Sequence, residues 1–168
     1  SSKKVETIRF LQKSKCQVRA TITAPHLFLT MDEVIGDMLC PHNFCKPIAK
    51  WKADRAVLRH AAMGGEPCFF LGSDSAPHDV GKKESSCGCA GCFTAPVLVE
   101  SLIEVFEQFD KLSALPNFMS NFGNDFYGCV DKEIPIRKYI AEKWAVPSRQ
   151  GGIRPWRAEE TLKWKLTN

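Results

Sequence analysis

Residues 68–78 have the sequence CFFLGSDSAPH, and this stretch decides the fold. Its first residues, 68–71, are continuously apolar, which is the pattern of a short strand buried on both faces, as in a parallel sheet. Asp74 follows where this predicted strand ends. In parallel α/β folds the reactive groups collect at the carboxyl ends of the strands, because the loops converge there. The stretch therefore predicts both a parallel sheet and a functional position for Asp74.

The segments on either side alternate between helical and strand patterns. In chain order the sequence predicts a helix over 2–13, a strand over 17–23, loops over 30–50, a helix over 53–63, the strand over 68–71, a helix over 97–109, a short helix within 117–128 and a closing strand over 161–166. Strands separated by helices indicate α/β architecture.

The length of the chain conflicts with the simplest such fold. The pattern is that of a (β/α) barrel, but a complete barrel needs about 250 residues, and this chain has 168 and begins with a predicted helix. We therefore expect an α/β fold that is the C-terminal half of a (β/α)8 TIM-type barrel with parallel strands, incomplete on its own. All of residues 1–168 are expected to belong to this portion, with no second domain.

The composition is typical of a soluble globular protein, with 44% hydrophobic and 25% charged residues. The formal net charge of +4 is spread as mixed-sign pairs such as Glu142/Lys143, without the basic stripe that nucleic-acid binding requires. No apolar run approaches the roughly 20 residues of a membrane span. The first ten residues, SSKKVETIRF, lack the apolar core of a signal peptide. We expect a cytoplasmic protein with neither nucleic acid nor membrane as partner.

Asp74 and His78 are the first candidates for chemistry. An aspartate at a strand end can ligate a metal through one oxygen while the other takes a proton from bound water, although loop aspartates more commonly cap their own turn. His78 can ligate a metal, hold a substrate anion or serve a structural role. The other histidines are His26 and His42, which each follow a proline near a predicted strand end, and His60, which lies within a predicted helix.

The eight cysteines have two interpretations at this point. Without an export signal, reduced thiols or metal ligands are favoured over disulfides. Cys87, Cys89 and Cys92 are close enough in sequence for a zinc site, but a closed site needs four ligands, and Cys40 or Cys45 would have to supply the fourth. Alternatively, they form a tight glycine-rich loop that presents backbone N–H groups to a carboxylate ligand. Three further cysteines have the pattern of small buried hydrophobes: Cys16, Cys68 and Cys129.

Several segments together resemble one protein family. The block FLGSDSAPH followed by KKESSCGCAGCFTAP resembles the end of the last barrel strand and the following loop of single-function dihydroorotases, members of the amidohydrolase superfamily. The similarity continues in the same order with RATITAPHL, PHNFCKPIAK, NFGNDFYG and AEETLKWKL. It covers nearly the whole chain, which a short motif alone does not.

The resemblance implies a zinc-dependent hydrolase of pyrimidine biosynthesis. Members of the family interconvert L-dihydroorotate and N-carbamoyl-L-aspartate by opening and closing a cyclic amide. Two zinc ions hold a bridging hydroxide that attacks the ring carbonyl, and an aspartate moves the proton to the leaving nitrogen. The family also implies a homodimer.

The resemblance assigns roles to four residues of this sequence. Asp74 matches the catalytic aspartate, which also ligates one zinc. His78 matches the histidine that holds the substrate carboxylate, and Ala90 matches a residue that contacts the same ligand through its backbone. Lys46 occupies another substrate-contacting position, where many relatives have leucine, and its contact is expected to run through the main chain. In this interpretation the cysteines shape the loop and do not bind the catalytic metals.

The remaining functional groups of the family have no counterpart here. Its His-x-His pair, carboxylated lysine, two further histidine ligands, and substrate-binding arginine and asparagine belong to the other half, and the last of those histidines would fall just before Ser1. The isolated chain is therefore expected to be inactive. Two alternatives are a non-catalytic half-barrel scaffold that binds a partner and a small zinc module built on residues 87–92, the cysteine loop.

Overall fold

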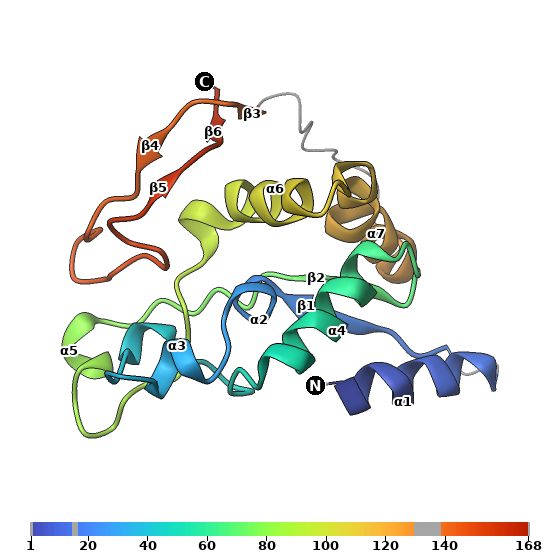
Figure 1. Cartoon of the computed structure of the whole chain (residues 1–168), viewed down its shortest axis with the longest axis horizontal. Coiled ribbons are helices and arrows are strands. Elements are labelled where there is room, and N and C mark those ends of the chain that lie inside the picture. Colours follow the sequence, from blue (N-terminus) through green and yellow to red (C-terminus); the bar gives the residue numbers. More distant parts are fainter. Residues whose placement is uncertain (1, 15–16, 130–138, 168) are drawn as a thin grey trace.

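Two parallel strands form the centre of the structure, a computed structural model that describes residues 2–14, 17–129 and 139–167 (Figure 1). Strand β1 (Ala20–Thr23) pairs with β2 (Phe69–Gly72). The register places the last residue of β1 opposite the last residue of β2, so both strands end at the same edge. In the described ranges each of these strands has only the other as a sheet partner, which leaves one edge of each strand open.

Short helices and turns make up most of the remaining structure. The helices are α1 (Ser2–Lys13), α2 (Ala24–Phe28), α3 (Asp32–Ile35), α4 (Lys52–Met63), α5 (Val80–Lys83), α6 (Leu98–Gln108) and α7 (Phe122–Tyr127). Single turns of 3-10 helix occur at Pro41–Asn43, Ala95–Val97 and Leu112–Ala114, and one π-helical turn occurs at Asn117–Asn121. Within the described residues no helix is long and apolar enough to cross a membrane.

The helices pack on both sides of the strand pair. Helix α1 packs against α4, and α4 packs in turn against β2 and α2. The π-helical turn and α7 contact β2, and Figure 1 shows α6 and α7 on the side of the strands opposite α1. The strand residues Phe69 and Phe70 are 2% and 3% exposed. This burial explains why their segment is apolar without alternation.

Most of the predicted elements are present. The helix over 2–13 is confirmed at both ends, the helix over 53–63 begins one residue earlier, and the strand over 68–71 is displaced by one residue. The strand predicted over 17–23 begins only at Ala20, because its pairing begins with the hydrogen bond from the Ala20 amide to the Cys68 carbonyl. The segment 30–50 contains no long element, as its glycine and prolines predict.

The C-terminal segment differs from the prediction. The single closing strand expected over 161–166 is wrong, because β5 (Thr161–Leu162) pairs with β4 (Trp144–Ala145), whereas β6 (Lys165–Leu166) pairs with β3 (Tyr139–Ile140). Both pairs are antiparallel, so the parallel prediction holds only for β1 and β2 among the described strands.

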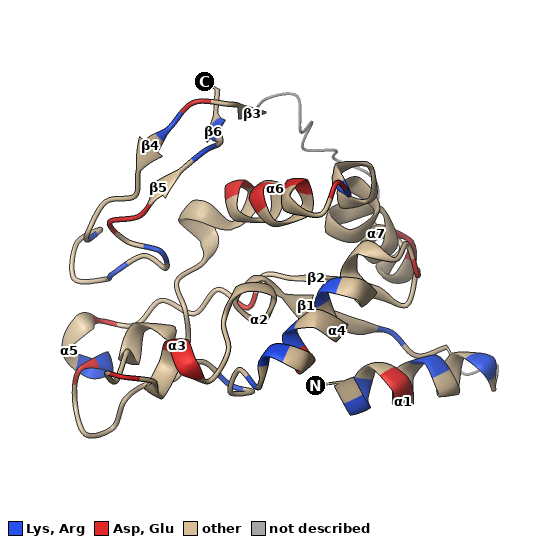
Figure 2. Cartoon of the chain, in the orientation of Figure 1, with Lys and Arg blue, Asp and Glu red and all other residues tan. Residues whose placement is uncertain are grey.

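The break between β5 and β6 has a local cause on α6. The Lys163 amide donates to Glu104 at 2.6 Å, and the Trp164 indole donates to Glu107 at 3.2 Å. Arg157 also forms an ion pair with Glu104 at 2.8 Å. Figure 2 shows acidic positions along α6, the helix beside the C-terminal segment. These contacts take residues 163 and 164 out of the ladder and hold the segment against α6.

The core lies between the strands and α6. Its fully buried members include Leu27, Phe69, Leu102, Phe106 and Phe118. The rings of Phe106 and Phe118 pack with their centroids 5.6 Å apart.

Replacing Phe106 by alanine should cost about 3–5 kcal/mol of unfolding free energy, because it leaves a cavity in a fully buried site. Phe109, the C-cap residue directly after α6, is the matched control. It is 48% exposed, and its ring centroid lies 5.4 Å from the guanidinium carbon of Arg59. Its replacement should cost only about 1 kcal/mol. Urea unfolding of the two variants measures the difference, and equal losses would contradict this core assignment.

Candidate active site

Asp74 lies just beyond β2, on a turn held by its neighbours. Its backbone has φ 44°, in the left-handed region that aspartate tolerates better than most residues. The Thr94 hydroxyl donates to the Ser73 carbonyl at 3.1 Å, and the Ala95 amide donates to the Ser75 hydroxyl at 3.0 Å. These bonds fix the turn on both sides of Asp74, whose side chain is exposed.

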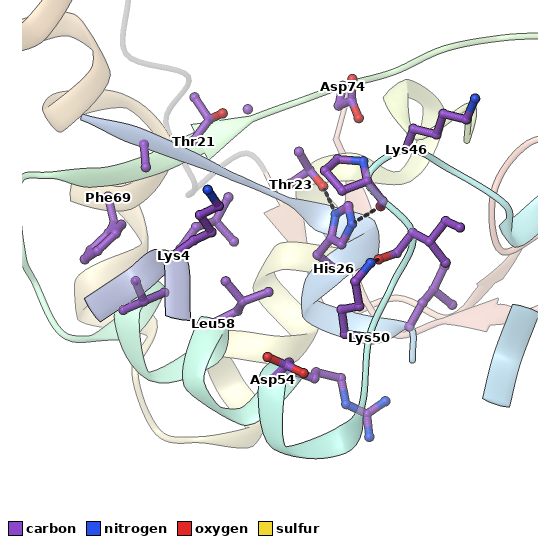
Figure 3. A pocket seen from close by; sticks show the side chains of 18 of the residues that line it. Lys4, Thr21, Thr23, His26, Lys46, Lys50, Asp54, Leu58, Phe69 and Asp74 are labelled. Atoms are coloured by element: carbon purple, nitrogen blue, oxygen red, sulfur yellow. Dashed lines mark hydrogen bonds between the residues drawn. The ribbon is translucent and has the colours of Figure 1, made fainter. Parts of the chain in front are cut away.

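A pocket of about 700 Å³ opens beside this turn. Its walls come from α1, β1, α4 and the loop 46–50. Figure 3 shows Asp74 and Lys46 at the end of the pocket where Thr23 and His26 lie. The charged residues in the lining are Lys4, Lys46, Lys50, Arg55, Asp54 and Asp74. The four cations exceed the two carboxylates, which favours an anionic ligand.

His26 holds the loop that carries Lys46. Its Nε2 donates to the Pro47 carbonyl at 2.6 Å, and so its Nδ1 accepts from the Thr23 hydroxyl at 2.6 Å in the neutral ring (Figure 3). Burial lowers the pKa of His26, which favours that neutral form. Both ring nitrogens are thus engaged, so His26 shapes the pocket.

The sequence favours His78 over His26 as a site residue, although the position of His26 near a predicted strand end was a usable signal.

His78 and Ala90 lie together and are not among the residues that line the pocket. The Nε2 atom of His78 donates to the Ala90 carbonyl at 3.0 Å. The half-buried imidazole therefore ties the turn to the glycine-rich cysteine loop. The structure thus arranges the four predicted residues as two pairs, with Asp74 and Lys46 at the pocket and His78 bonded to Ala90.

Lys83 is a buried residue of this region that sequence reasoning missed. It lies at the end of α5 with only 4% of its surface exposed. Its Nζ atom donates to the carbonyls of Phe44, Cys89 and Gly91 at 3.2, 2.9 and 2.5 Å. Burial lowers the pKa of Lys83. Nothing in the sequence distinguishes it from Lys82, which is exposed.

The thiols around Lys83 form two pairs. Cys45 donates to the Pro47 carbonyl at 3.8 Å and Cys92 to the His42 carbonyl at 3.4 Å. The interaction of these two neighbouring thiols raises the pKa of Cys92 and lowers that of Cys45. The sulfur atoms of Cys87 and Cys89 lie 3.9 Å apart. In residues 2–14, 17–129 and 139–167 no three histidine, cysteine, aspartate or glutamate side chains are grouped as metal ligands. The described cysteines therefore do not form the four-ligand zinc site considered from the sequence.

The three remaining cysteine predictions have different outcomes. Cys68 is buried, as predicted. Cys129 is exposed because it follows the end of α7, so its predicted burial is wrong. Cys16 lies outside the described residues.

Asp74 is the one predicted metal ligand of this chain, and the described residues around it do not complete a site. His26 has both nitrogens engaged, and His78 uses Nε2 for the Ala90 carbonyl. A zinc ion needs three or four protein ligands. The described part of the chain therefore does not hold a zinc ion with its own side chains.

The sequence is similar to bacterial dihydroorotases. It is 37% identical over 165 residues to the dihydroorotase of Idiomarina loihiensis, with 96% of this chain and 48% of that protein covered. It is 41% identical over 165 residues to the dihydroorotase of Nitrosomonas europaea, with 96% of this chain and 47% of that protein covered. No model of a protein family matches the chain.

The fold is similar to solved dihydroorotases. The crystal structure of the Saccharomyces cerevisiae dihydroorotase in complex with 5-fluoroorotic acid superimposes with a TM-score of 0.87 at 35% identity, covering 99% of this chain and 49% of that chain. The Campylobacter jejuni dihydroorotase superimposes with a TM-score of 0.78 at 34% identity, covering 92% of this chain and 46% of that chain. The resemblance inferred from the sequence is confirmed, and the chain spans about half the length of the relatives it matches.

Gly91 sits where the cysteine loop meets the Asp74 turn, and its replacement by alanine should strain both. Its φ is 149°, and a Cβ there would lie 2.6 Å from the Cβ of Ala76 and 3.0 Å from Cδ2 of His78. We expect Gly91→Ala to lose more than about 2 kcal/mol of unfolding free energy.

Gly88→Ala is the control for this prediction. Gly88 also has a positive φ, 52°, but the nearest atom to its added Cβ is 3.9 Å away. It should lose only about 1 kcal/mol. Chemical denaturation compares the two variants, and a Gly88 variant as unstable as the Gly91 variant would show that close packing is not what requires glycine at 91.

Proposed function

We propose that this chain is the C-terminal half of a dihydroorotase, and that the complete protein interconverts L-dihydroorotate and N-carbamoyl-L-aspartate in pyrimidine biosynthesis. The observation that carries the proposal is the position of Asp74. It follows β2 at the carboxyl edge of a parallel strand pair and lines a pocket with excess positive charge. Reactive groups of α/β folds lie at this edge. The similarity to dihydroorotases over 96% of the chain supports the same activity.

The open strand edges support a half barrel. We infer that β1 and β2 are neighbouring strands of an eight-stranded parallel barrel whose other strands lie outside this chain. An isolated two-stranded sheet has unpaired backbone groups along both outer edges. Strands supplied by the rest of the protein would pair with them. The portion of barrel domain expected over residues 1–168 and the homodimer remain predictions.

The pocket chemistry suits the substrate class. Dihydroorotate combines a cyclic amide with a carboxylate, so it needs a group that moves protons and a group that binds an anion. The Saccharomyces cerevisiae relative was crystallised with 5-fluoroorotic acid, which also carries a carboxylate on its ring. Cations around the pocket, Lys4 and Lys50 among them, attract such a ligand.

In this proposal Asp74 is the proton carrier. A carboxylate oxygen accepts the proton of the attacking water and delivers it to the ring nitrogen that leaves when the amide opens. Ring closure uses the same two transfers in reverse. Asp54 also lines the pocket but accepts hydrogen bonds from the Ser2 amide and hydroxyl at 2.8 and 3.0 Å. Those bonds favour a structural role for Asp54.

The substrate carboxylate is assigned to the cysteine loop and its neighbours. Both nitrogens of an imidazolium are donors, so in this assignment Nδ1 of His78 donates to the carboxylate while Nε2 fixes the Ala90 carbonyl. The Ala90 backbone N–H is the second donor. Lys46 contributes through its main chain, so leucine at this position would serve equally well.

Zinc is the cofactor that the family implies. Asp74 is the residue of this chain assigned to it, and the other ligands would have to come from outside residues 1–168. When bound, zinc would polarise the ring carbonyl, but the described residues do not complete its site. For the same reason we expect the isolated chain to be inactive.

Asp74→Asn should reduce kcat of the complete protein by at least about 10²–10⁴-fold in both directions, because an amide cannot accept the proton. Binding of 5-fluoroorotate and the thermal midpoint should change little. Asp54→Asn is the matched control, since it removes the other pocket carboxylate. Near-normal turnover by the Asp74 variant would refute the proposed role of Asp74.

His78→Ala should raise KM about tenfold or more and lower kcat less, because it removes a carboxylate donor and frees the Ala90 carbonyl. His60→Ala on α4 is the control, since His60 is exposed. Steady-state kinetics and the zinc content of the complete protein distinguish the roles. Zinc loss by the His78 variant equal to that of the Asp74 variant would show that His78 is instead a metal-site residue.

A further inference from the structure

The buried ammonium of Lys83 has an unusual set of partners. An ammonium has three N–H donors and no acceptor, and each donor here has a carbonyl partner, on Phe44, Cys89 and Gly91. Carbonyls carry no formal negative charge, so these bonds leave the positive charge of Lys83 uncancelled. A charge is costly to bury, and a loop that needed only to be tied down would be served by neutral donors.

The three carbonyls belong to the two segments that the proposed function assigns to substrate. Cys89 and Gly91 flank Ala90, and Phe44 lies two residues before Lys46. The Gly91 amide also donates to the Phe44 carbonyl at 2.9 Å. Lys83 therefore fastens the cysteine loop to the segment before Lys46.

Peptide geometry connects Lys83 to the Ala90 amide. The Cys89 carbonyl and the Ala90 N–H belong to one planar peptide unit, in which C=O and N–H point in opposite directions when the bond is trans. When Lys83 holds the carbonyl, the N–H of Ala90 points away from the ammonium. The next peptide unit is fixed by further bonds, because His78 bonds the Ala90 carbonyl and the Gly91 amide donates to the Phe44 carbonyl.

Helix α5 brings Lys83 to this place. The Asp79 side chain caps the helix by accepting from the Gly81 amide at 2.8 Å. The Val80 amide donates to the Gly152 carbonyl at 2.9 Å, which joins α5 to the C-terminal segment. The backbone of Lys83 is therefore held by α5, and its ammonium is held by the three carbonyls.

We propose that Lys83 is a positioning residue for the substrate carboxylate: it aims the Ala90 N–H at the anion and places a buried positive charge behind the loop. The inference rests on the proposed function and deepens it. It assigns part of the anion recognition to a side chain that does not touch the substrate. A residue that acted only as structural support would affect stability and turnover without a specific effect on anion binding.

The test is Lys83→Met in the complete protein, which keeps the length of the side chain and removes the charge and the donors. Lys82→Met is the matched control, because Lys82 is the exposed neighbour on the same helix. We expect KM for dihydroorotate and the Kd of 5-fluoroorotate to rise about tenfold or more, the change expected when a charge-assisted hydrogen bond is lost or misaligned. The kcat and the zinc content should stay within about twofold of wild type. Lys82→Met should change none of these quantities.

A second variant keeps the test decisive if Lys83→Met does not fold. Lys83→Gln retains two N–H donors without the charge and should raise KM and Kd in the same direction. Unchanged KM and Kd in a folded variant, or losses of kcat and zinc as large as the rise in KM, would overturn the inference. Wild-type complete protein without dihydroorotase activity would refute the proposed function instead, so the two failures are distinguishable.

Discussion

The parallel pairing of β1 with β2 is the constraint on which the site depends. Because Thr23 lies opposite Gly72, the chain leaves both strands at one edge. His26 follows β1 and Asp74 follows β2, and both line the same pocket. A displaced register would separate these two loops, since a shift by one residue also reverses which face each side chain occupies.

Beyond that edge, backbone carbonyls organise the loops. Three of them bind the Lys83 ammonium, the Pro47 carbonyl binds His26, and the Ala90 carbonyl binds His78. Each bond fixes a peptide plane, and through it the direction of the neighbouring N–H group. In the proposed function the region presents main-chain donors, a common way of binding anions in loops. The side chains named here support the backbone more than they line the cavity.

The packing is most complete on the side of α6. There, Leu102 and Phe106 are fully buried, and Glu104 holds both Arg157 and the backbone of the C-terminal segment. The strand pair is less enclosed, with one open edge on each strand among the described elements. The pocket borders β1 and α1 on this less enclosed side.

The sequence by itself determined the local elements and made Asp74 the first candidate for the site. Helix α1, helix α4 and the strand at 69–72 follow from apolar spacing, and Asp74 follows from its place after that strand, because these depend on neighbours along the chain. Only the tertiary structure decided the burial of Lys83, the bond between His78 and Ala90, and the division of the C-terminal strand by Glu104. These depend on groups many residues apart that become neighbours only when the loops pack. Lys82 and Lys83 are identical in local sequence terms, yet one is exposed and the other is buried against three carbonyls.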